Sequence, residues 1–342
     1  PVTPANLQIS MENCATCHAR REELTANGFH AGERFFDHYR LTLPDTPGAY
    51  FPDGQALEED YVYASFMMSR MGHKGITCMD CHNPHSGDPI LPVQNNALCM
   101  RCHSTGANES IVIDPLIHSH HKEGSAGNSC IECHMPERVY MGRDSRRDHG
   151  FTSPDPQLTI DFGVPNTCNT CHADQTTEWA NEHVNSWYGD TQRRNHVQNR
   201  AKTLTDAHQG LPDSLAAVKL ILAAEENVYW KTAWMRLLSV NAQDDSVVEI
   251  AEENFKHESP MLREASLTVL SQRQEQLENL QLALKDEALL VRNRAAEALM
   301  SQFDPGMEAF QEWEDYAEMN ADRPGGSLRR AELALVQGDF PL

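Results

Sequence analysis

Hydrophobic and polar positions follow two different patterns along this chain of 342 residues. From about Thr176 onward, apolar residues recur at the three- and four-residue spacing of amphipathic helices, as at Leu215, Val218 and Leu222. Glycine and proline become sparse there, and alanine, leucine, glutamate and glutamine dominate. The pattern predicts that residues 176–342 form an all-α region.

Three segments of this helical region are similar to one another, namely 230–238, 262–270 and 291–299. Alignment on Ala233, Ala265 and Ala296 gives spacings of 32 and 31 residues, which are the differences between those residue numbers. The spacing resembles that of short HEAT-type repeats, in which paired helices stack into a solenoid. A generic amphipathic helical bundle is the alternative, and both interpretations predict helices alone.

Residues 1–175 have a different character, because they are rich in glycine, proline, asparagine and histidine. Segments such as 43–48 and 153–156 are predicted to be loops or turns. So few aliphatic runs occur here that an ordinary hydrophobic core would be difficult to build. All ten cysteines of the chain lie in this region, between Cys14 and Cys171.

The cysteines form five copies of Cys-x-x-Cys-His, at residues 14–18, 78–82, 99–103, 130–134 and 168–172. This pattern is the attachment signature of c-type haem, in which two thiols bond one haem and the histidine ligates its iron. Zinc sites also use Cys-x-x-Cys but do not need the histidine, and neither disulfide scaffolds nor a thioredoxin-like motif would repeat it. Because only 17 of 342 residues are histidine, five matches in five positions are not accidental.

We therefore predict five covalently attached haem c groups, each with its iron, as the cofactors. Their apolar discs would form the core of residues 1–175, so the haem-free chain is not expected to fold stably. The predicted haem-attachment residues are Cys14, Cys17, Cys78, Cys81, Cys99, Cys102, Cys130, Cys133, Cys168 and Cys171. The predicted proximal iron ligands are His18, His82, His103, His134 and His172.

The opposite face of each iron decides what a haem can do, since a second strong ligand favours electron transfer and a vacant face permits catalysis. The predicted distal ligands are His73, His85, His118, His121 and His149. His85 follows His82 by three residues and cannot reach the far face of the same iron, so it would serve a neighbouring haem. The open alternatives are His30 or His38 at the first haem, and Met67, Met68, Met71 or Met79 in place of histidine elsewhere. The histidines predicted to be structural or exposed are His183, His196, His208 and His257.

Signs of catalysis are weaker. The sequence contains no Cys-x-x-Cys-Lys, the variant that attaches the active haem of multihaem nitrite reductases. Tyr140, Arg143, Arg146 and Arg147 could stabilise an oxyanion, but we favour pairing of the arginines with haem propionates. The sequence therefore predicts an electron-transfer protein. The alternatives are a reductase of a small nitrogen or sulfur oxyanion with one haem lacking a distal ligand, and a scaffold that haems merely stabilise.

The formal net charge of −22 argues against binding of nucleic acid or of an anionic membrane surface. The predicted partners are a redox protein that donates or accepts electrons, or other copies of the chain in a filament, although the acidity could equally serve solubility. No apolar run approaches the roughly 20 residues of a membrane-spanning helix. The chain begins with proline rather than methionine, which fits removal of a secretory signal and predicts a periplasmic or extracellular location.

Seven stretches resemble a family of bacterial multihaem c-type cytochromes that is distantly related to the cytochrome c nitrite reductase and hydroxylamine oxidoreductase superfamily. They are residues 61–71, 78–86, 124–127, 130–136, 140–141, 146–149 and 165–172. The resemblance implies a mainly α protein, with a haem-cored domain of little regular strand at 1–175 and HEAT- or tetratricopeptide-like repeats at 176–342. It also implies that the five distal histidines occupy recurrent positions of the family. Members often carry further haems upstream, so the chain could match only the later part of such a protein.

Overall fold

The computed structural model describes residues 4–189, 191–302, 304–323 and 325–338. It is mainly helical, with 56% helix and little strand, which confirms the predicted fold class. Packing divides the chain into two units, each made of two segments. The first unit contains Pro1–Cys14 and Thr46–Gln209, and the second contains Ala15–Asp45 and Gly210–Leu342. The division falls inside helix α1 (Pro4–His18), between its residues Cys14 and Ala15.

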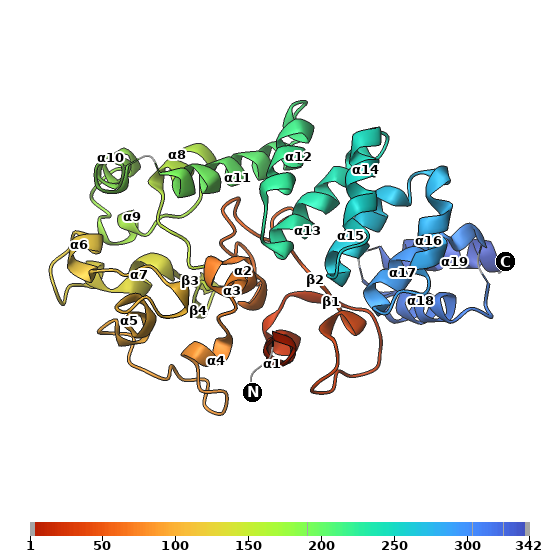
Figure 1. The fold of residues 1–342 in the computed structure, drawn as a ribbon, viewed down its shortest axis with the longest axis horizontal. Coiled ribbons are helices and arrows are strands. Elements are labelled where there is room, and N and C mark those ends of the chain that lie inside the picture. The colour runs from red at the N-terminus through yellow and green to blue at the C-terminus, as the bar shows by residue number, and fades with distance from the viewer. Residues whose placement is uncertain (1–3, 190, 303, 324, 339–342) are drawn as a thin grey trace. The chain divides into compact units, whose positions relative to one another are not determined.

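The first unit is built mostly from short helices joined by turns (Figure 1). Its further α-helices are α2 (Tyr63–Met68), α3 (Arg70–His73), α4 (Cys78–Cys81), α5 (Ala97–His103), α6 (Pro115–Ser119), α7 (Cys130–His134), α8 (Pro156–Phe162), α9 (Cys168–Cys171), α10 (Thr177–Tyr188) and α11 (Gln192–His208). Two 3-10 turns, η2 (Ala107–Glu109) and η3 (Ala126–Asn128), lie among them. Strands β3 (Glu137–Tyr140) and β4 (Asp144–Arg147) form an antiparallel pair, with Glu137 opposite Arg147 and Tyr140 opposite Asp144.

Local side-chain caps explain why such short helices begin where they do. At α4, Asp80 accepts the backbone N–H of Thr77 at 2.8 Å in a capping box. Asp114 before α6 accepts two N–H groups of the first turn, Asp155 before α8 accepts one, and a proline follows each aspartate. These caps satisfy N–H groups that a helix of four to seven residues cannot pair internally.

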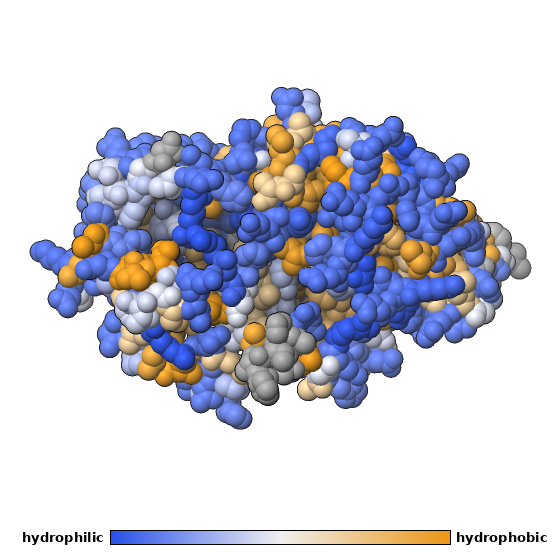
Figure 2. All heavy atoms as spheres, in the orientation of Figure 1, coloured by the Kyte–Doolittle hydropathy of each residue, from blue (hydrophilic) through white to orange (hydrophobic). Residues whose placement is uncertain are grey.

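Hydrophobic burial in the first unit is uneven. Helices α10 and α11 pack on α8, where Leu158, Val164 and Ala201 form a small core. Residues 70–130, by contrast, contain no buried hydrophobic side chain, and their only buried residues are Gly72, Thr77 and Asn96. Several apolar side chains of this stretch are exposed, and hydrophobic spheres reach the surface around α6 in Figure 2. A conventional core therefore does not hold this part of the chain together.

The second unit is a row of stacked helices that follow one another along the chain (Figure 1). Its α-helices are α12 (Ser214–Ala224), α13 (Val228–Leu237), α14 (Asp245–Asn254), α15 (Pro260–Leu270), α16 (Leu277–Ala283), α17 (Leu289–Ala298), α18 (Glu308–Met319) and α19 (Gly326–Gln337). The 3-10 turns η1 (Phe35–Asp37), η4 (Leu238–Asn241), η5 (Gln274–Gln276) and η6 (Met300–Gln302) belong to it, as do the paired strands β1 (Arg21–Glu23) and β2 (Tyr39–Leu41).

The three similar sequence segments fall on α13, α15 and α17, which pack on one another in that order. Ala233, Ala265 and Ala296 are fully buried, as expected of small residues where helices approach closely. Trp230 and Trp234 of α13 add a stacked aromatic pair to the same core, with ring centres 5.7 Å apart. The assignment of these helices to the HEAT class stays a prediction.

Packing places the change between the two parts of the chain later than the composition does. The sequence suggested a boundary at residues 175 and 176, whereas α10 and α11 belong to the first unit because they pack on α8. The segment 15–45 joins the second unit instead, where Asp37 accepts the N–H of Leu289 at 2.9 Å and Tyr316 donates to Glu22 at 2.7 Å. Only long-range contacts reveal this arrangement, so the composition of the chain could not predict it.

Candidate haem-attachment site

Each Cys-x-x-Cys-His motif lies on a helical turn or at its end. The motif of Cys14 closes α1, and the motifs of Cys78, Cys99, Cys130 and Cys168 lie on α4, α5, α7 and α9. Residues three apart share one face of a helix, so both thiols of a motif project to the same side. The histidine is the last residue of the helix or follows directly after it. This arrangement presents two sulfur atoms and one imidazole to a single group.

Three of the motif histidines face a second histidine from elsewhere in the first unit. The ring centres of His82 and His149 are 6.3 Å apart, and those of His134 and His118 are 6.0 Å apart. The third pair is His172 and His121, at 6.1 Å. In each pair one ring comes from a motif and the other is a predicted distal ligand.

Hydrogen bonds fix the orientation of several of these rings. The Nδ1 atoms of His82, His103 and His134 lie 2.8 to 2.9 Å from the backbone carbonyl oxygens of Gly87, Ile111 and Thr152. The Nδ1 atoms of His121 and His149 make the same kind of bond, to the carbonyl oxygens of Ser119 at 2.5 Å and Arg147 at 2.9 Å. A histidine that donates its Nδ1–H to a carbonyl presents an unprotonated Nε2, which is the form that ligates a metal.

The surroundings of one pair also favour neutral rings. Burial is the main cause that lowers the pKa of His118, helped by the nearby charges of His120 and Arg193. Burial likewise lowers the pKa of His134, against a hydrogen bond to Thr152 that raises it. Both rings are therefore neutral at neutral pH and able to act as ligands.

The remaining candidates for distal ligands have other surroundings. His73 ends α3 at an exposed position, and His85 is exposed, with its backbone N–H bonded to Asn83. His38, a reserve candidate, has Nδ1 3.2 Å from the carbonyl of Asn27 and Nε2 2.9 Å from Glu33, and His30 pairs with the same glutamate. Both nitrogens of His38 are therefore engaged by protein groups.

Successive motifs in the first unit are joined by direct contacts. The thiols of Cys14 and Cys78 share a hydrogen bond, which lowers the pKa of Cys14 to about 6, and Cys78 N–H also donates to the sulfur of Met11 at 3.4 Å. Arg101, inside the third motif, donates to the carbonyl of Asp80 in the second at 3.2 Å. Cys99 and Cys130 likewise share a thiol hydrogen bond, which lowers the pKa of Cys130 to about 7.

Asn96 is a residue that the sequence did not single out. It is 7% exposed, adopts a left-handed φ of 63°, accepts the N–H of Cys130 at 2.9 Å and donates to the carbonyl of Asn128 at 2.8 Å. It thereby connects the start of α5, with the third motif, to the start of α7, with the fourth. An Asn-Asn pair before a motif is a turn signal, but nothing in the sequence names its partner thirty residues away.

Two of the three arginines considered for an oxyanion or for propionates, Arg146 and Arg147, are engaged within the protein. Arg146 pairs with Glu59 and Asp144. Arg147 pairs with Glu132 at 2.7 Å and donates to the carbonyls of Ile131 and Met135 at the end of α7. Arg147 thereby holds β4 against the helix of the fourth motif, whereas Arg146 links β4 to Glu59.

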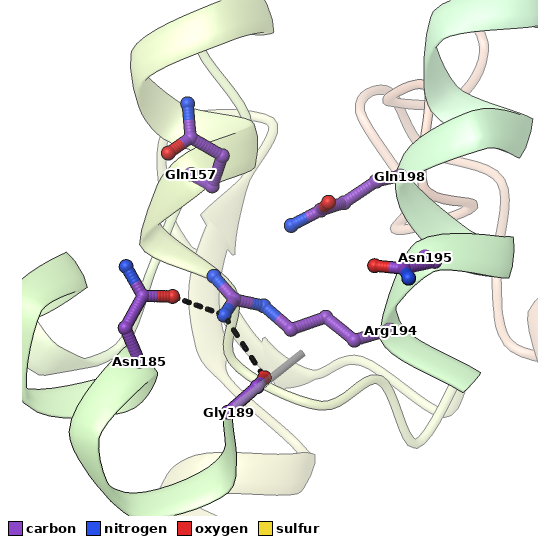
Figure 3. Close-up of a pocket in the computed structure, with 6 residues that line it drawn as sticks. All are labelled: Gln157, Asn185, Gly189, Arg194, Asn195 and Gln198. Carbon is purple, nitrogen blue, oxygen red and sulfur yellow. Dashed lines mark hydrogen bonds between the residues drawn. The ribbon is translucent and has the colours of Figure 1, made fainter. Parts of the chain in front are cut away.

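A polar cavity of about 390 Å³ lies between α8, α10 and α11 (Figure 3). Arg194 crosses it and bonds Asn185 and the carbonyl of Gly189, as the dashed lines show. Its guanidinium also forms a bidentate pair with the nearly buried Asp155, at 2.7 and 3.0 Å. Because the protein satisfies its hydrogen-bond donors, Arg194 connects three helices rather than binding a ligand.

The donor set suits haem. Within the part of the chain that the structure describes, no three or more His, Cys, Asp and Glu side chains gather around a point, as they would at a bare metal ion. Six histidines come instead in three pairs, and one histidine of each pair lies in the segment 70–130, which has no hydrophobic core. Two axial imidazoles, two thioethers and an apolar setting are what a covalently bound porphyrin requires.

These features define a multihaem c-type cytochrome. The comparisons agree, since residues 117–256 match the cytochrome c552 family and residues 72–108 match the doubled CXXCH motif. A solved structure, that of the outer cell wall cytochrome OcwA, has 14% sequence identity and a TM-score of 0.41 over 76% of this chain and 63% of that one. The chain thus spans somewhat less than two thirds of that protein's length. No curated protein matches the chain.

No helix within the described ranges has the combination of length and apolar composition needed to cross a lipid bilayer.

Proposed function

We propose that this protein carries electrons along five covalently bound haems, most of them ligated by two histidines. The observation that carries the proposal is the spacing of the three facing histidine pairs, 6.0 to 6.3 Å between ring centres. With each nitrogen about 2 Å from a metal, two imidazoles on opposite faces of one ion have ring centres roughly 6 Å apart. The distances between ring centres in the three pairs match this value.

The pairs assign ligands to three irons. His149 would be the distal ligand opposite His82, His118 the one opposite His134, and His121 the one opposite His172. His73 and His85 remain proposed distal ligands, without an assigned partner. When bound, haem supplies an iron that exchanges one electron without making or breaking bonds to a substrate, provided both axial positions are filled.

The contacts between motifs support a row of haems in sequence order. Cys14 meets Cys78, Arg101 meets the backbone of Asp80, and Cys99 meets Cys130, which joins the first four motifs in turn. The fourth and fifth are linked through their proposed distal ligands, because His118 and His121 are only three residues apart. Attachment residues this near to one another would place neighbouring haems close together, as a path for electrons requires.

Partner and location follow from chemistry rather than from any contact in the structure. The chain carries 50 acidic and 28 basic residues, so a redox partner with a basic docking face is the expected donor or acceptor. Assembly of copies into a filament is a further version of the same function. Because c-type haem is attached outside the cytoplasm, we place the protein in the periplasm or the extracellular space.

The holoprotein tests this proposal directly. Its intact mass should exceed that of the polypeptide by five haems, and magnetic circular dichroism should show low-spin haem alone. Replacing His149 by alanine should convert about one fifth of the haem to high spin, since one of five irons loses a ligand. The matched control is His208→Ala, at the end of α11, which should change nothing.

A native high-spin fraction would favour the alternative, a reductase with one open haem. A His149→Ala variant that keeps the native spectrum would refute the assigned pair, and a mass with fewer than five haems would refute the number of cofactors.

A further inference from the structure

His121 lies on a turn that has no covalent restraint of its own. It follows α6 directly after His120, which has the left-handed φ of 57°. By contrast, His172 directly follows Cys171 within its motif, so the thioether bonds that tether the haem also restrain this ligand. Two axial ligands of one iron would therefore be held by different means. Noncovalent contacts must hold His121, and the residues that make them form its seat.

The first part of that seat is Gly127 in η3. A Cβ atom at this position would lie 2.5 Å from Cγ and 2.7 Å from Nε2 of His121, well inside van der Waals contact. Gly127 does not have the positive φ that requires glycine at many turns. Its missing side chain is therefore explained by the His121 ring, which occupies the space that any other residue would fill.

The second part is Trp187 of α10. Its ring stacks on that of His120, with centres 4.5 Å apart and planes at 12°, and meets the edge of His121 at 6.3 Å. The stack offsets part of the cost that a non-glycine residue incurs in the left-handed region. It thereby stabilises the turn that directs His121 toward His172.

The same helix provides an internal comparison. Trp179 lies two turns before Trp187 and contacts the other ring of the pair, with its centre 5.0 Å from that of His172. His183 lies between the two tryptophans, 4.3 and 5.5 Å from their ring centres. One aromatic face of α10 therefore reaches both histidines, but only His121 depends on it for its position.

We propose that Gly127 and Trp187 are positioning residues that seat His121 as the distal ligand of the fifth haem. The inference rests on the proposed axial pair of His121 and His172. Gly127 acts by leaving room for the ring, and Trp187 acts by holding the turn through His120. Neither residue touches the iron.

The test uses the holoprotein with five variants, of which His121→Ala tests the axial ligand itself. Gly127→Ala and Trp187→Ala should each convert up to about one fifth of the haem to high spin, because one of five irons loses its sixth ligand. Added imidazole should restore the low-spin spectrum, since it can fill the vacated position. Trp179→Ala is the matched control on the same helix, and Gly28→Ala, where a Cβ would meet nothing within 4 Å, controls for loss of glycine. Both controls should remain fully low-spin.

Intact mass showing five haems in every variant separates displacement of His121 from misfolding. The proposal is overturned if both seat variants keep the native spectrum, or if Trp179→Ala loses as much low-spin haem as Trp187→Ala. Failure of the proposed function would give a different result from failure of this inference. If His121 were not an iron ligand, His121→Ala would itself leave the native spectrum unchanged.

Discussion

Glu264 of α15 is the most deeply buried carboxylate of the second unit, and its loss should be costly. It is 1% exposed and accepts two hydrogen bonds from the guanidinium of Arg236, at 3.0 and 3.2 Å. Arg40 pairs with its other oxygen at 2.9 Å. Burial alone would raise the pKa of Glu264, but the positive charges of Arg40 and Arg236 outweigh it and lower the pKa to about 2.

The size of the effect follows from that pKa. A shift from 4.5 to about 2 corresponds to about 3 kcal/mol of folding free energy at neutral pH, at about 1.4 kcal/mol per pKa unit. Breaking a buried ion pair by removing one partner costs about 3–5 kcal/mol by general experience, which agrees. Glu264→Gln keeps the shape but leaves Arg40 and Arg236 buried without a counter-ion. We therefore expect it to lower the free energy of unfolding by about 3 kcal/mol at pH 7.

The pH dependence of this loss of unfolding free energy tests the reasoning more sharply than its size alone. Because the folded pKa lies below the unfolded one, the contribution is complete above about pH 5 and is lost as pH falls through 4.5 toward 2. The difference between the native protein and Glu264→Gln should therefore shrink to less than half by about pH 3. Urea unfolding followed by far-ultraviolet circular dichroism measures it. Glu312→Gln is the matched control, because its bidentate pair with Arg292 is partly exposed and should cost only about 1 kcal/mol or less.

Equal losses for Glu264→Gln and Glu312→Gln would refute the argument from burial. A difference between native protein and Glu264→Gln that stays constant from pH 7 to pH 3 would refute the assigned ionisation.

Two further predictions concern the first unit. Asn96→Gly keeps the left-handed backbone but removes the side-chain hydrogen bonds to Cys130 and Asn128, so it should lower the free energy of unfolding by about 1–3 kcal/mol. Asn108→Gly, at an exposed left-handed position, should have little effect. Thermal melting compares the two variants, and equal melting temperatures would contradict the role of Asn96 as a clamp between α5 and α7. Chain produced without haem attachment should be cut by protease within residues 70–130 before the helices α12–α19, because that stretch buries no hydrophobic side chain. Mass spectrometry of the early fragments locates the cuts, and first cleavage in the helical row would contradict the prediction.

Local spacing predicts that each motif forms a helical turn, but it does not predict which histidines come together in space. The spacing of the cysteines predicts two thiols on one helical face, and all five motifs have the required helical turn. The pairings, however, join His118 to His134, His121 to His172 and His82 to His149, across 16, 51 and 67 residues by subtraction of their numbers. These separations follow no periodicity, because they are set by how loops cross the unit and not by the repeat of a helix.

The residues that sequence reasoning missed act through such long-range placement. Trp179, His183 and Trp187 recur at four-residue intervals, which is an aromatic stripe on one helical face and could have been recognised as a contact surface. Gly127 gives no such signal, since a glycine near a motif is normally a turn residue. In the second unit, the similar segments around Ala233, Ala265 and Ala296 were recognisable from sequence, and the three alanines are buried where α13, α15 and α17 pack in chain order.

The two units consequently depend on different sources of stability. In the second, buried tryptophans, leucines and the Glu264 network supply burial and pairing from the polypeptide alone. In the stretch 70–130, helix caps, Nδ1 bonds and the Asn96 clamp fix backbone geometry, but hydrogen bonds contribute only about 1 kcal/mol each because water competes for them. Burial of apolar surface must then come from the haems, and the same groups that exchange electrons complete the fold. A variant that loses a haem should therefore lose local structure in the first unit, whereas the helical row has no need of the cofactor for its own core.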